Sequence, residues 1–272
     1  SINDNGFAVA VWETRNPGYQ LQGALIPAVP EPAANSFTIA TDATLPNVQM
    51  LPDHKFLTVW TGGNLKGKIY DYSGSLTVIK NDFTLDNSPD FIPYPPMLDA
   101  DSNGKTTILY QPFKDSYVNV KSCQLDANGT MVTSPLYLEK DQYDSDDRLL
   151  GLDVGYSGSV SALWGSVPET FLTVEHMNSH LDNIWGPLSI FRHIVQKDLH
   201  GYAVPAVGFN NKTWTLYSSP YSGMYLARRS QNGYRTDPYL YALRAGSGAA
   251  YPQTAMNQTT GYAAVTWHGH ES

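Results

Sequence analysis

Short apolar stretches recur along the chain, and six of them end in an aromatic residue. The closing aromatics are Trp12, Trp60, Tyr110, Trp164, Tyr217 and Trp267. They follow one another at steps of 48, 50, 54, 53 and 50 residues. A near-constant period of this size is typical of repeat architectures. We call these six residues the marker aromatics, and the predicted strands that they close the marker strands.

Each repeat contains four short stretches rich in apolar, β-branched and aromatic residues, separated by turns rich in Gly, Asn, Asp, Pro and Ser. This pattern predicts four strands per repeat, A to D, with the marker strand as B. The chain then begins with B, C and D, contains four complete A–B–C–D units, and ends with A and B. In the third repeat, the alternation predicts strand C at residues 117–120. No segment keeps the 3.6-residue period of an amphipathic helix, so the pattern predicts an all-β protein.

A four-stranded antiparallel unit that recurs every 48–54 residues is typical of a β-propeller blade. We therefore predict one β-propeller domain over residues 1–272, with the ring closed by pairing of the N- and C-terminal strands. The strand count favours five blades and leaves one copy of strand B over. Six blades are the alternative.

A resemblance to a known class rests on two stretches, Phe56-Leu57-Thr58-Val59-Trp60 and Tyr262-Ala263-Ala264-Val265-Thr266-Trp267. The pattern resembles β-propeller repeat proteins, including lectin-like propellers whose blades carry a Gly/apolar strand that ends in Trp. The period spans nearly the whole chain, whereas the sequence resemblance covers about seven residues per repeat. The Trp-Asp pair of WD repeats, the Gly-Gly pattern of kelch repeats and the turn motif of sialidases do not occur.

Composition narrows the class of partner. The chain is acidic, with a net charge of −8 and a pI near 5.2, and its 17 Lys and Arg residues are scattered. These features argue against a nucleic-acid partner, which requires a basic face. No apolar run is long enough to span a membrane, so we expect a soluble protein. We expect it to be secreted or extracellular, with a cytoplasmic location as the alternative; the oligomeric state stays open.

Aromatic side chains are the first candidates for ligand contacts, because an aromatic face stacks on the apolar face of a sugar ring. Five of them fall outside the marker positions, in segments that we predict to be loops. They are Tyr94, Trp185, Tyr221, Tyr234 and Tyr239. The marker residues Trp60, Trp164 and Trp267 are candidates as well. For the marker aromatics, packing between neighbouring sheets is the favoured alternative, because a fixed blade position is also what packing requires.

Acidic residues are the second set of candidates, because glycosidases use a pair of carboxylates. Those expected near the ends of inner strands are Glu13, Asp53, Asp99, Asp101 and Asp153. An ordinary turn role is the favoured interpretation for these acids. They also do not recur in every repeat, which fits either one central site or simple turns.

The segment from Asp99 to Gly104 has the Asp-x-Asp-x-Asn-Gly spacing of calcium-binding loops. Asp99, Asp101 and Asn103 would be the calcium ligands. Position 12 of a complete loop would be acidic but is Tyr110 here, and the same composition favours a hairpin turn. Calcium is the only cofactor that the sequence suggests. The single cysteine, Cys123, excludes an intrachain disulfide and is predicted to be a small buried side chain.

The sequence therefore predicts a carbohydrate-binding, lectin-type propeller that recognises glycans or glycoproteins through loop aromatics and Asn or Asp side chains. We expect a binding protein rather than an enzyme. The alternatives are a glycoside hydrolase-like enzyme with one central carboxylate site, and a protein-interaction scaffold.

Overall fold

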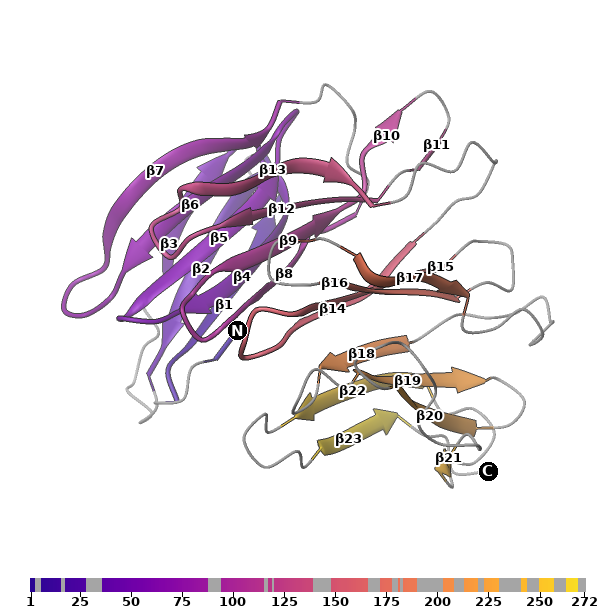
Figure 1. Ribbon diagram of the computed structural model, residues 1–272. Helices are drawn as coiled ribbons and strands as arrows, with labels where there is room; N and C mark the ends of the chain where they lie inside the picture. The colour runs from indigo at the N-terminus through magenta and orange to yellow at the C-terminus, as the bar shows by residue number, and fades with distance from the viewer. Residues whose placement is uncertain are drawn as a thin grey trace. The chain divides into compact units, whose positions relative to one another are not determined.

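The computed structural model shows only β-structure, turns and bends in the residues that it describes (Figure 1). The described residues are 1–2, 6–15, 18–27, 36–87, 94–114, 117–118, 120–138, 148–165, 172–177, 181, 183–189, 203–207, 213–219, 223–229, 241–243, 250–256 and 263–268. The chain divides into two compact units, Ser1–Gln142 and Tyr143–Ser272. Among the described residues, no helix is long and apolar enough to cross a membrane. The all-β prediction is confirmed.

The first unit contains three sheets of antiparallel strands and a small hairpin. Sheet 1 consists of β1 (Ala8–Thr14), β2 (Gln20–Ile26) and β3 (Ser36–Thr41). Sheet 2 consists of β4 (Thr44–Leu51), β5 (Lys55–Thr61), β6 (Leu65–Asp71) and β7 (Thr77–Asp86). Sheet 3 consists of β8 (Met97–Ala100), β9 (Thr106–Tyr110), β12 (Lys121–Leu125) and β13 (Met131–Tyr137). The hairpin pairs β10 (Phe113–Lys114) with β11 (Tyr117–Val118).

The second unit also contains three antiparallel sheets. Sheet 4 consists of β14 (Arg148–Val154), β15 (Val160–Gly165), β16 (Leu172–Met177) and β17 (Asn183–Ser189). Sheet 5 consists of β18 (Ala203–Val207), β19 (Thr213–Ser219), β20 (Gly223–Arg229) and β21 (Tyr241–Leu243). Sheet 6 pairs β22 (Ala250–Met256) with β23 (Ala263–His268).

Each marker strand lies in a different sheet, in the strand order that the sequence predicts. The terminal strands pair with their sequence neighbours, β1 with β2 and β22 with β23. The edge of β1 away from β2 is partly occupied by the first residue, because Val9 N donates to Ser1 O at 2.9 Å and the Ser1 amino group donates to Val9 O at 3.1 Å. The blade count and the closure of the ring stay predictions.

The third repeat departs from the prediction. Residues 117–120, predicted as strand C, contain only the short strand β11, and strand C is β12. The sequence favours the earlier stretch because β12 carries the polar residues Lys121, Ser122 and Gln124. Each has a partner when buried: Ser122 Oγ donates to Ile108 O at 3.1 Å, and Gln124 Nε2 donates to Thr107 Oγ1 at 3.1 Å. Burial with satisfied hydrogen bonds makes a polar strand stable in the core.

Strand β5 of sheet 2 is buried on both faces, which explains why apolar residues occupy both sets of alternate positions in this strand. On one face, Trp60 packs with Leu21 and Ile39 of sheet 1. On the other face, Leu57 and Val59 pack in one cluster with residues of sheet 3, including Ile108. Alternate side chains of β5 therefore belong to two different cores, and the strand joins three sheets into one unit.

Two glycines of strand C let an aromatic ring lie flat on the sheet. Gly23 pairs with Phe37, and Gly67 pairs with Phe83 at the corresponding place in the next sheet. A Cβ atom on Gly23 would lie 2.5 Å from Phe37 Cζ, and one on Gly67 would lie 2.9 Å from Phe83 Cζ. Glycine is needed here for close approach rather than for an unusual φ angle.

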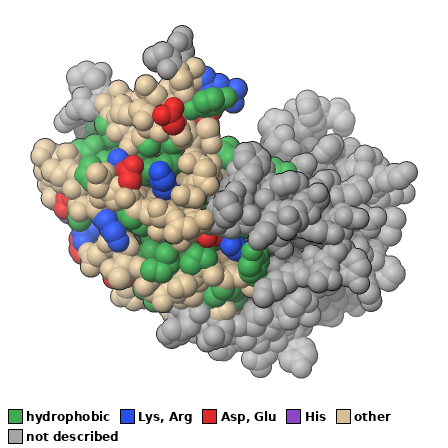
Figure 2. Space-filling view, turned by 90° about the horizontal axis from the view of Figure 1, so that it is seen from above, with side chains coloured by type: hydrophobic (Ala, Val, Ile, Leu, Met, Phe, Trp, Pro, Cys, Tyr) green, Lys and Arg blue, Asp and Glu red, His purple; other side chains and the backbone are tan. Residues whose placement is uncertain are grey.

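The described surface mixes small apolar areas with single charges. Figure 2 shows Lys, Arg, Asp and Glu side chains interspersed among apolar and uncharged groups on the described part of one face. The exposed large apolar side chains, such as Val78 and Val132, come from several different strands. Scattered apolar side chains of this kind are normal on a protein surface.

Candidate functional site

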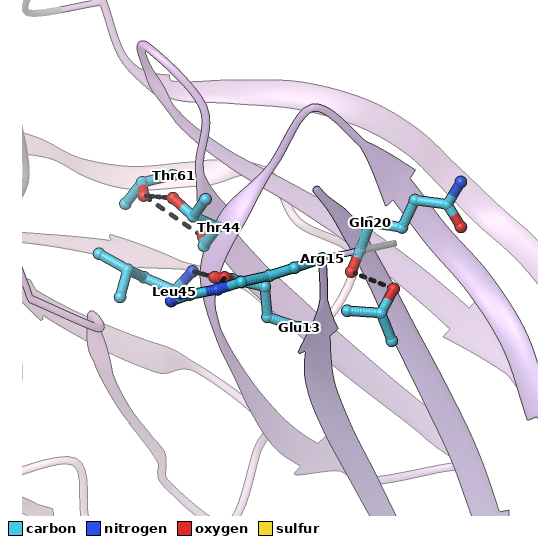
Figure 3. A network of polar contacts seen from close by, with 7 residues as sticks. Glu13, Arg15, Gln20, Thr44, Leu45 and Thr61 are labelled. Atoms are coloured by element: carbon cyan, nitrogen blue, oxygen red, sulfur yellow. Dashed lines mark hydrogen bonds and ion pairs between the residues drawn. The ribbon is translucent and has the colours of Figure 1, made fainter. Parts of the chain in front are cut away.

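Glu13 lies at the end of the first marker strand, directly after Trp12. It shares a face of β1 with Val9 and Val11, which pack toward sheet 2. Its side chain is only 19% exposed, and its two carboxylate oxygens have different partners (Figure 3). Oε1 accepts a hydrogen bond from Arg15 Nε at 3.1 Å, and Oε2 accepts one from Leu45 N at 3.4 Å. The carboxylate is therefore held in place by two different segments.

The segment that donates to Glu13 has a strained backbone. Asp42 and Leu45 both have a φ of 52°, which lies in the left-handed region that residues other than glycine rarely adopt. Leu45 and Pro46 stand opposite Trp60 alone, because the register shifts between Thr44 and Asn47. This is a β-bulge, a feature that redirects groups near functional sites. Strain of this kind costs about 1–3 kcal/mol per residue and persists only where the surroundings enforce it.

Arg15 and Tyr19 complete the site on either side of the turn between β1 and β2. The Arg15 guanidinium carbon lies 5.8 Å from the centre of the Tyr19 ring. The Arg15 side chain is 78% exposed, and Tyr19 is 48% exposed. Tyr19 O accepts a hydrogen bond from Asp42 N at 2.8 Å, which ties this turn to the strained segment. We call Glu13, Arg15, Tyr19 and Leu45 the Glu13 site.

The Glu13 site differs from the corresponding places in the next two sheets. Thr61 follows Trp60, and Gln111 follows Tyr110, and both are buried. Thr61 Oγ1 lies 3.1 Å from Thr44 Oγ1, so it is engaged within its own sheet (Figure 3). Among these three positions, only the first has a charged side chain beside an exposed aromatic ring. The site combines a fixed acceptor, a cationic donor and an aromatic face.

The sequence pointed to Glu13 but missed Arg15, Tyr19 and Leu45. Charged residues make up only 15% of the chain, and Glu13 and Arg15 lie close together between two predicted strands. That spacing, with an aromatic residue just beyond the turn, was the available signal. The strain at Leu45 has no counterpart in the amino-acid pattern.

Two of the three marker tryptophans that the sequence offered as ligand contacts are buried in the described part of the chain. Trp60 is 2% exposed, and Trp164 is buried to a similar degree. Their burial fits the packing interpretation that the sequence favoured, and a ligand contact by either residue stays a prediction. The exposed member is Trp12, at 38%. It lies on the face of β1 opposite to Glu13.

The other predicted aromatic contacts fall in different settings. Tyr94 is half-buried and lies just before β8, outside any strand, as expected. Trp185 is not in a loop, because it belongs to β17 and pairs with His176 of β16. Trp267 belongs to β23, and its side chain lies outside the described residues. Tyr221, Tyr234 and Tyr239 also lie outside the described residues.

The predicted calcium loop has the hydrogen bonds of a hairpin turn. Asp101 Oδ1 accepts from Asn103 N and Lys105 N, both at 2.9 Å, and Asp99 Oδ1 accepts from Ala100 N at 2.9 Å. Gly104 has a φ of 77°, as the turn requires. The same geometry recurs where Asp126 Oδ1 accepts from Asn128 N and Thr130 N. One Asp101 oxygen is thus committed to the backbone, and a calcium role stays a prediction.

The predicted acids of the first unit lie at two different ends of their sheets, Glu13 at one end and Asp53, Asp99 and Asp101 at the other. Asp53 follows β4 in an exposed turn with a φ of 56°, at the opposite end of β4 from Leu45. Asp99 and Asp101 likewise lie at the end of β8. The Glu13 site therefore does not include Asp53, Asp99 or Asp101.

Two of the acids occupy equivalent positions in sheets 3 and 4. Asp99 pairs with Thr107 of β9, three residues before Tyr110. Asp153 pairs with Ser161 of β15, three residues before Trp164, and Ser161 pairs in turn with His176. Ser161 is buried, and its Oγ atom has no hydrogen-bond partner among the residues that the structure describes. We call Asp153, Ser161 and His176 the Ser161 row.

The sequence also missed a buried ion pair between sheets 2 and 3. Lys121 Nζ lies 3.0 Å from Asp86 Oδ2, and Tyr110 Oη donates to the same oxygen at 2.6 Å. Burial alone would lower the pKa of Lys121, but the hydrogen bond to Asp86 and its negative charge raise that pKa above its usual value. Burial also raises the pKa of Tyr110, with added contributions from Cys123 and Asp86. These groups are far apart in sequence, which is why no local pattern reveals them.

Cys123 lies fully buried on the same face of β12 as Lys121. Burial, together with the negative charge of Asp86, raises the pKa of its thiol to about 12. Because the thiolate is the reactive form, we expect native protein not to react with a chromogenic disulfide reagent at neutral pH. Denaturant should release one thiol per chain. Rapid reaction of the folded protein would contradict this placement of Cys123.

No protein-family model matches the chain, and no curated protein matches it in sequence. Solved structures do match in fold. A lectin from Burkholderia pseudomallei matches with a TM-score of 0.63 at 10% identity, over 97% of this chain and 81% of the lectin. An α-L-arabinanase from Penicillium chrysogenum, complexed with arabinobiose, matches with a TM-score of 0.55 at 14% identity, over 99% and 87% of the two chains. An α-L-arabinofuranosidase of Fusarium graminearum with arabinobiose matches with a TM-score of 0.55 at 11% identity, over 99% and 86%.

At these identities the likeness concerns the fold. The neighbours are β-propellers, and the described strands of this chain form the four-stranded antiparallel sheets of that class. The fold prediction is confirmed at this level: the chain is an all-β protein of the β-propeller type. Lectins and glycoside hydrolases share this fold, so the fold alone does not choose between them.

Proposed function

We propose that the protein is a carbohydrate-binding, lectin-type module whose ligands are glycans or glycoproteins. The observation that carries this proposal is the Glu13 site, where an exposed tyrosine ring lies beside a guanidinium group that is hydrogen-bonded to a fixed carboxylate. An aromatic face packs on the C–H face of a sugar ring, and the two charged groups bond its hydroxyls. The likeness of the fold to a lectin supports the same class of ligand.

The geometry of the Glu13 site suits a ligand with several hydroxyl groups. Glu13 is already oriented by Leu45 N and Arg15 Nε, so little side-chain freedom is lost when a sugar hydroxyl donates to it. Tyr19 offers a partly exposed ring beside Arg15, the hydrogen-bond partner of that carboxylate. Such shallow sites bind single sugars weakly and gain strength through multivalent contact.

The remaining predicted contacts belong to the same proposal as secondary candidates. Tyr94 is the one whose side chain is described, and it is half-buried at the start of β8. Trp185, Trp267, Tyr221, Tyr234 and Tyr239 stay candidates from the sequence alone. Because the sheets differ at the position of Glu13, we expect one or a few sites rather than one equal site per repeat.

A glycan array of the intact protein tests the proposed function. We expect binding to a defined group of related sugars, without cleavage of the bound glycans. Loss of binding after calcium is chelated would assign a role to Asp99, Asp101 and Asn103. A blank array at high protein concentration would contradict the proposal and favour the protein-interaction scaffold.

A glycoside hydrolase is the second candidate, and one specific observation favours it. Asp99 and Asp153 occupy equivalent register positions, and each stands beside a hydroxyl residue, Thr107 or Ser161. The two matched arabinan-type enzymes, each bound to arabinobiose, make arabino-oligosaccharides the first substrates to try. Release of reducing ends, lost on Asp153→Asn but retained on Asp53→Asn, would establish this alternative.

The blade count belongs to the proposal as well. The sequence favours five blades, whereas six sheets each contain one marker strand. We propose six sheet positions, with the first lacking strand A and the last lacking strands C and D among the described residues.

A further inference from the structure

We propose that the Glu13 site recognises an acidic sugar, whose anionic group is bound by Arg15 while its ring stacks on Tyr19. This inference rests on the proposed carbohydrate-binding function and names its ligand class. The shared chemistry is one anionic oxygen group on a short glycan, either the carboxylate of a uronic acid or a sulfate ester.

The first argument is how Arg15 is held. Its Nε atom donates to Glu13 Oε1 at 3.1 Å, and its guanidinium group lies 5.8 Å from the centre of the Tyr19 ring. The Nε edge of the guanidinium group is thus occupied by Glu13, and the Tyr19 ring lies beside the group. Arginine carries donors in a rigid planar fork, so fixing the Nε edge also fixes the direction of the Nη atoms.

The second argument is what remains available on Arg15. No hydrogen bond or ion pair joins its Nη atoms to another described residue, and its side chain is 78% exposed. Two parallel N–H groups in this arrangement match the paired oxygens of a carboxylate or sulfate. A neutral sugar hydroxyl would use only one of them.

The third argument is that Glu13 orients Arg15 without occupying the Nη end of its guanidinium group. The Glu13 carboxylate is 19% exposed, and both of its oxygens accept hydrogen bonds, from Arg15 Nε and from Leu45 N. Its carboxylate contacts the Nε edge, and its negative charge keeps the attraction of Arg15 for an anion modest. Glu13 therefore positions Arg15 for a ligand on the other side of the guanidinium group.

The overall charge of the chain limits the size of the ligand. The net charge of −8 repels long polyanions, whose approach depends on the field of the whole protein. Local recognition by one arginine is short-range and is less affected, because salt at physiological strength screens exposed charges that lie more than about 8–10 Å apart. We therefore expect short acidic oligosaccharides rather than extended polyanionic chains.

Isothermal titration of the full chain with three probes tests the inference. The probes are a galacturonic acid trimer, the neutral galactose trimer and a galactose trimer with one sulfate ester. We expect the acidic trimers to bind about two- to fivefold more tightly than the neutral one, the range for one exposed charged pair. The two acidic arms distinguish carboxylate from sulfate recognition.

Variants of Arg15 distinguish the effect of its positive charge from the effect of its paired N–H donors. Arg15→Gln should remove the preference for the acidic trimer, and Arg15→Lys should restore it only in part, because lysine keeps the charge without the paired donors. Lys55→Gln makes the same change in net charge at the far end of sheet 2 and should leave the preference intact.

The possible results distinguish this inference from the proposed function. Equal affinity for acidic and neutral trimers, or a preference that survives Arg15→Gln, would overturn the acidic-sugar inference alone. Failure of all three trimers together with a blank glycan array would contradict carbohydrate binding itself, and this inference with it.

Discussion

Replacing Asp86 by alanine should lower the free energy of unfolding by about 3–5 kcal/mol, the usual result when one partner of a buried ion pair is removed. The variant leaves Lys121 charged, although its side chain is only 8% exposed. It also removes the acceptor of the Tyr110 hydroxyl. Chemical denaturation followed by tryptophan fluorescence measures the loss.

The Lys68–Asp82 pair of the same unit provides the matched control. Its atoms are 2.8 Å apart, and the Asp82 side chain is 45% exposed. Lys68 is only 11% exposed, but it also donates to Ile39 O at 2.7 Å and therefore keeps an acceptor when Asp82 is removed. Asp82→Ala should therefore cost less than about 1 kcal/mol. Equal losses in the two variants would show that the Asp86 pair is not buried as described.

A double replacement separates the missing charge from the missing contact. Asp86→Leu combined with Lys121→Met removes both charges while filling the space with apolar groups. We expect it to recover most of the stability lost in Asp86→Ala, because no unpaired charge is left in the core. The raised pKa of Lys121 also predicts a pH dependence of stability. The stabilisation that charged Lys121 contributes is present at neutral pH and is lost only as the pH rises through that raised pKa.

Truncating Trp60 should have the second largest effect. Trp60→Ala removes a side chain that is 2% exposed and packs with Leu21 and Ile39, so we expect a loss of about 3–5 kcal/mol. Trp12 occupies the same position in its marker strand but is 38% exposed. Trp12→Ala should cost about half as much or less, because less apolar surface leaves water there.

The Trp60 comparison also separates packing from ligand binding. We expect Trp60→Ala to lower the midpoint of denaturant unfolding without changing the glycan affinity of the protein that stays folded. If Trp60→Ala abolished glycan binding at unchanged stability, the ligand-stacking role would be correct after all. The same pair of measurements on Trp12→Ala shows whether the exposed marker aromatic contacts a ligand.

The sequence predicted the fold because the fold depends on features that repeat. The spacing of the marker aromatics and the turn residues between strands set the strand order, and each strand adds its own apolar pattern. The prediction failed at β12, whose Lys121 and Gln124 are satisfied by residues from other strands. A polar residue can be recognised as a core residue only when its hydrogen-bond or ion-pair partner is known, and that partner is set by the tertiary structure.

The candidate site was predictable only in part, for the same reason. Glu13 stood out as an acid just after a marker aromatic. Its partners could not be inferred, because the hydrogen bond from Leu45 depends on a bulge and a positive φ angle that the amino-acid pattern does not encode. Conversely, the sequence could not decide between packing and ligand contact for Trp60, because burial depends on the neighbouring sheet. Repetition predicts where an aromatic residue lies, but not whether a neighbour covers it.

The most direct test of carbohydrate binding at the Glu13 site compares two exposed tyrosines. Tyr19 is in the site and Tyr156 is in the turn between β14 and β15, and both are exposed. The best array ligand is titrated against the full chain, Tyr19→Ala and Tyr156→Ala. The account predicts that Tyr19→Ala weakens binding by about tenfold or more, the effect of losing one stacking contact, while Tyr156→Ala binds like the unmodified protein. Unchanged binding by Tyr19→Ala would contradict the account.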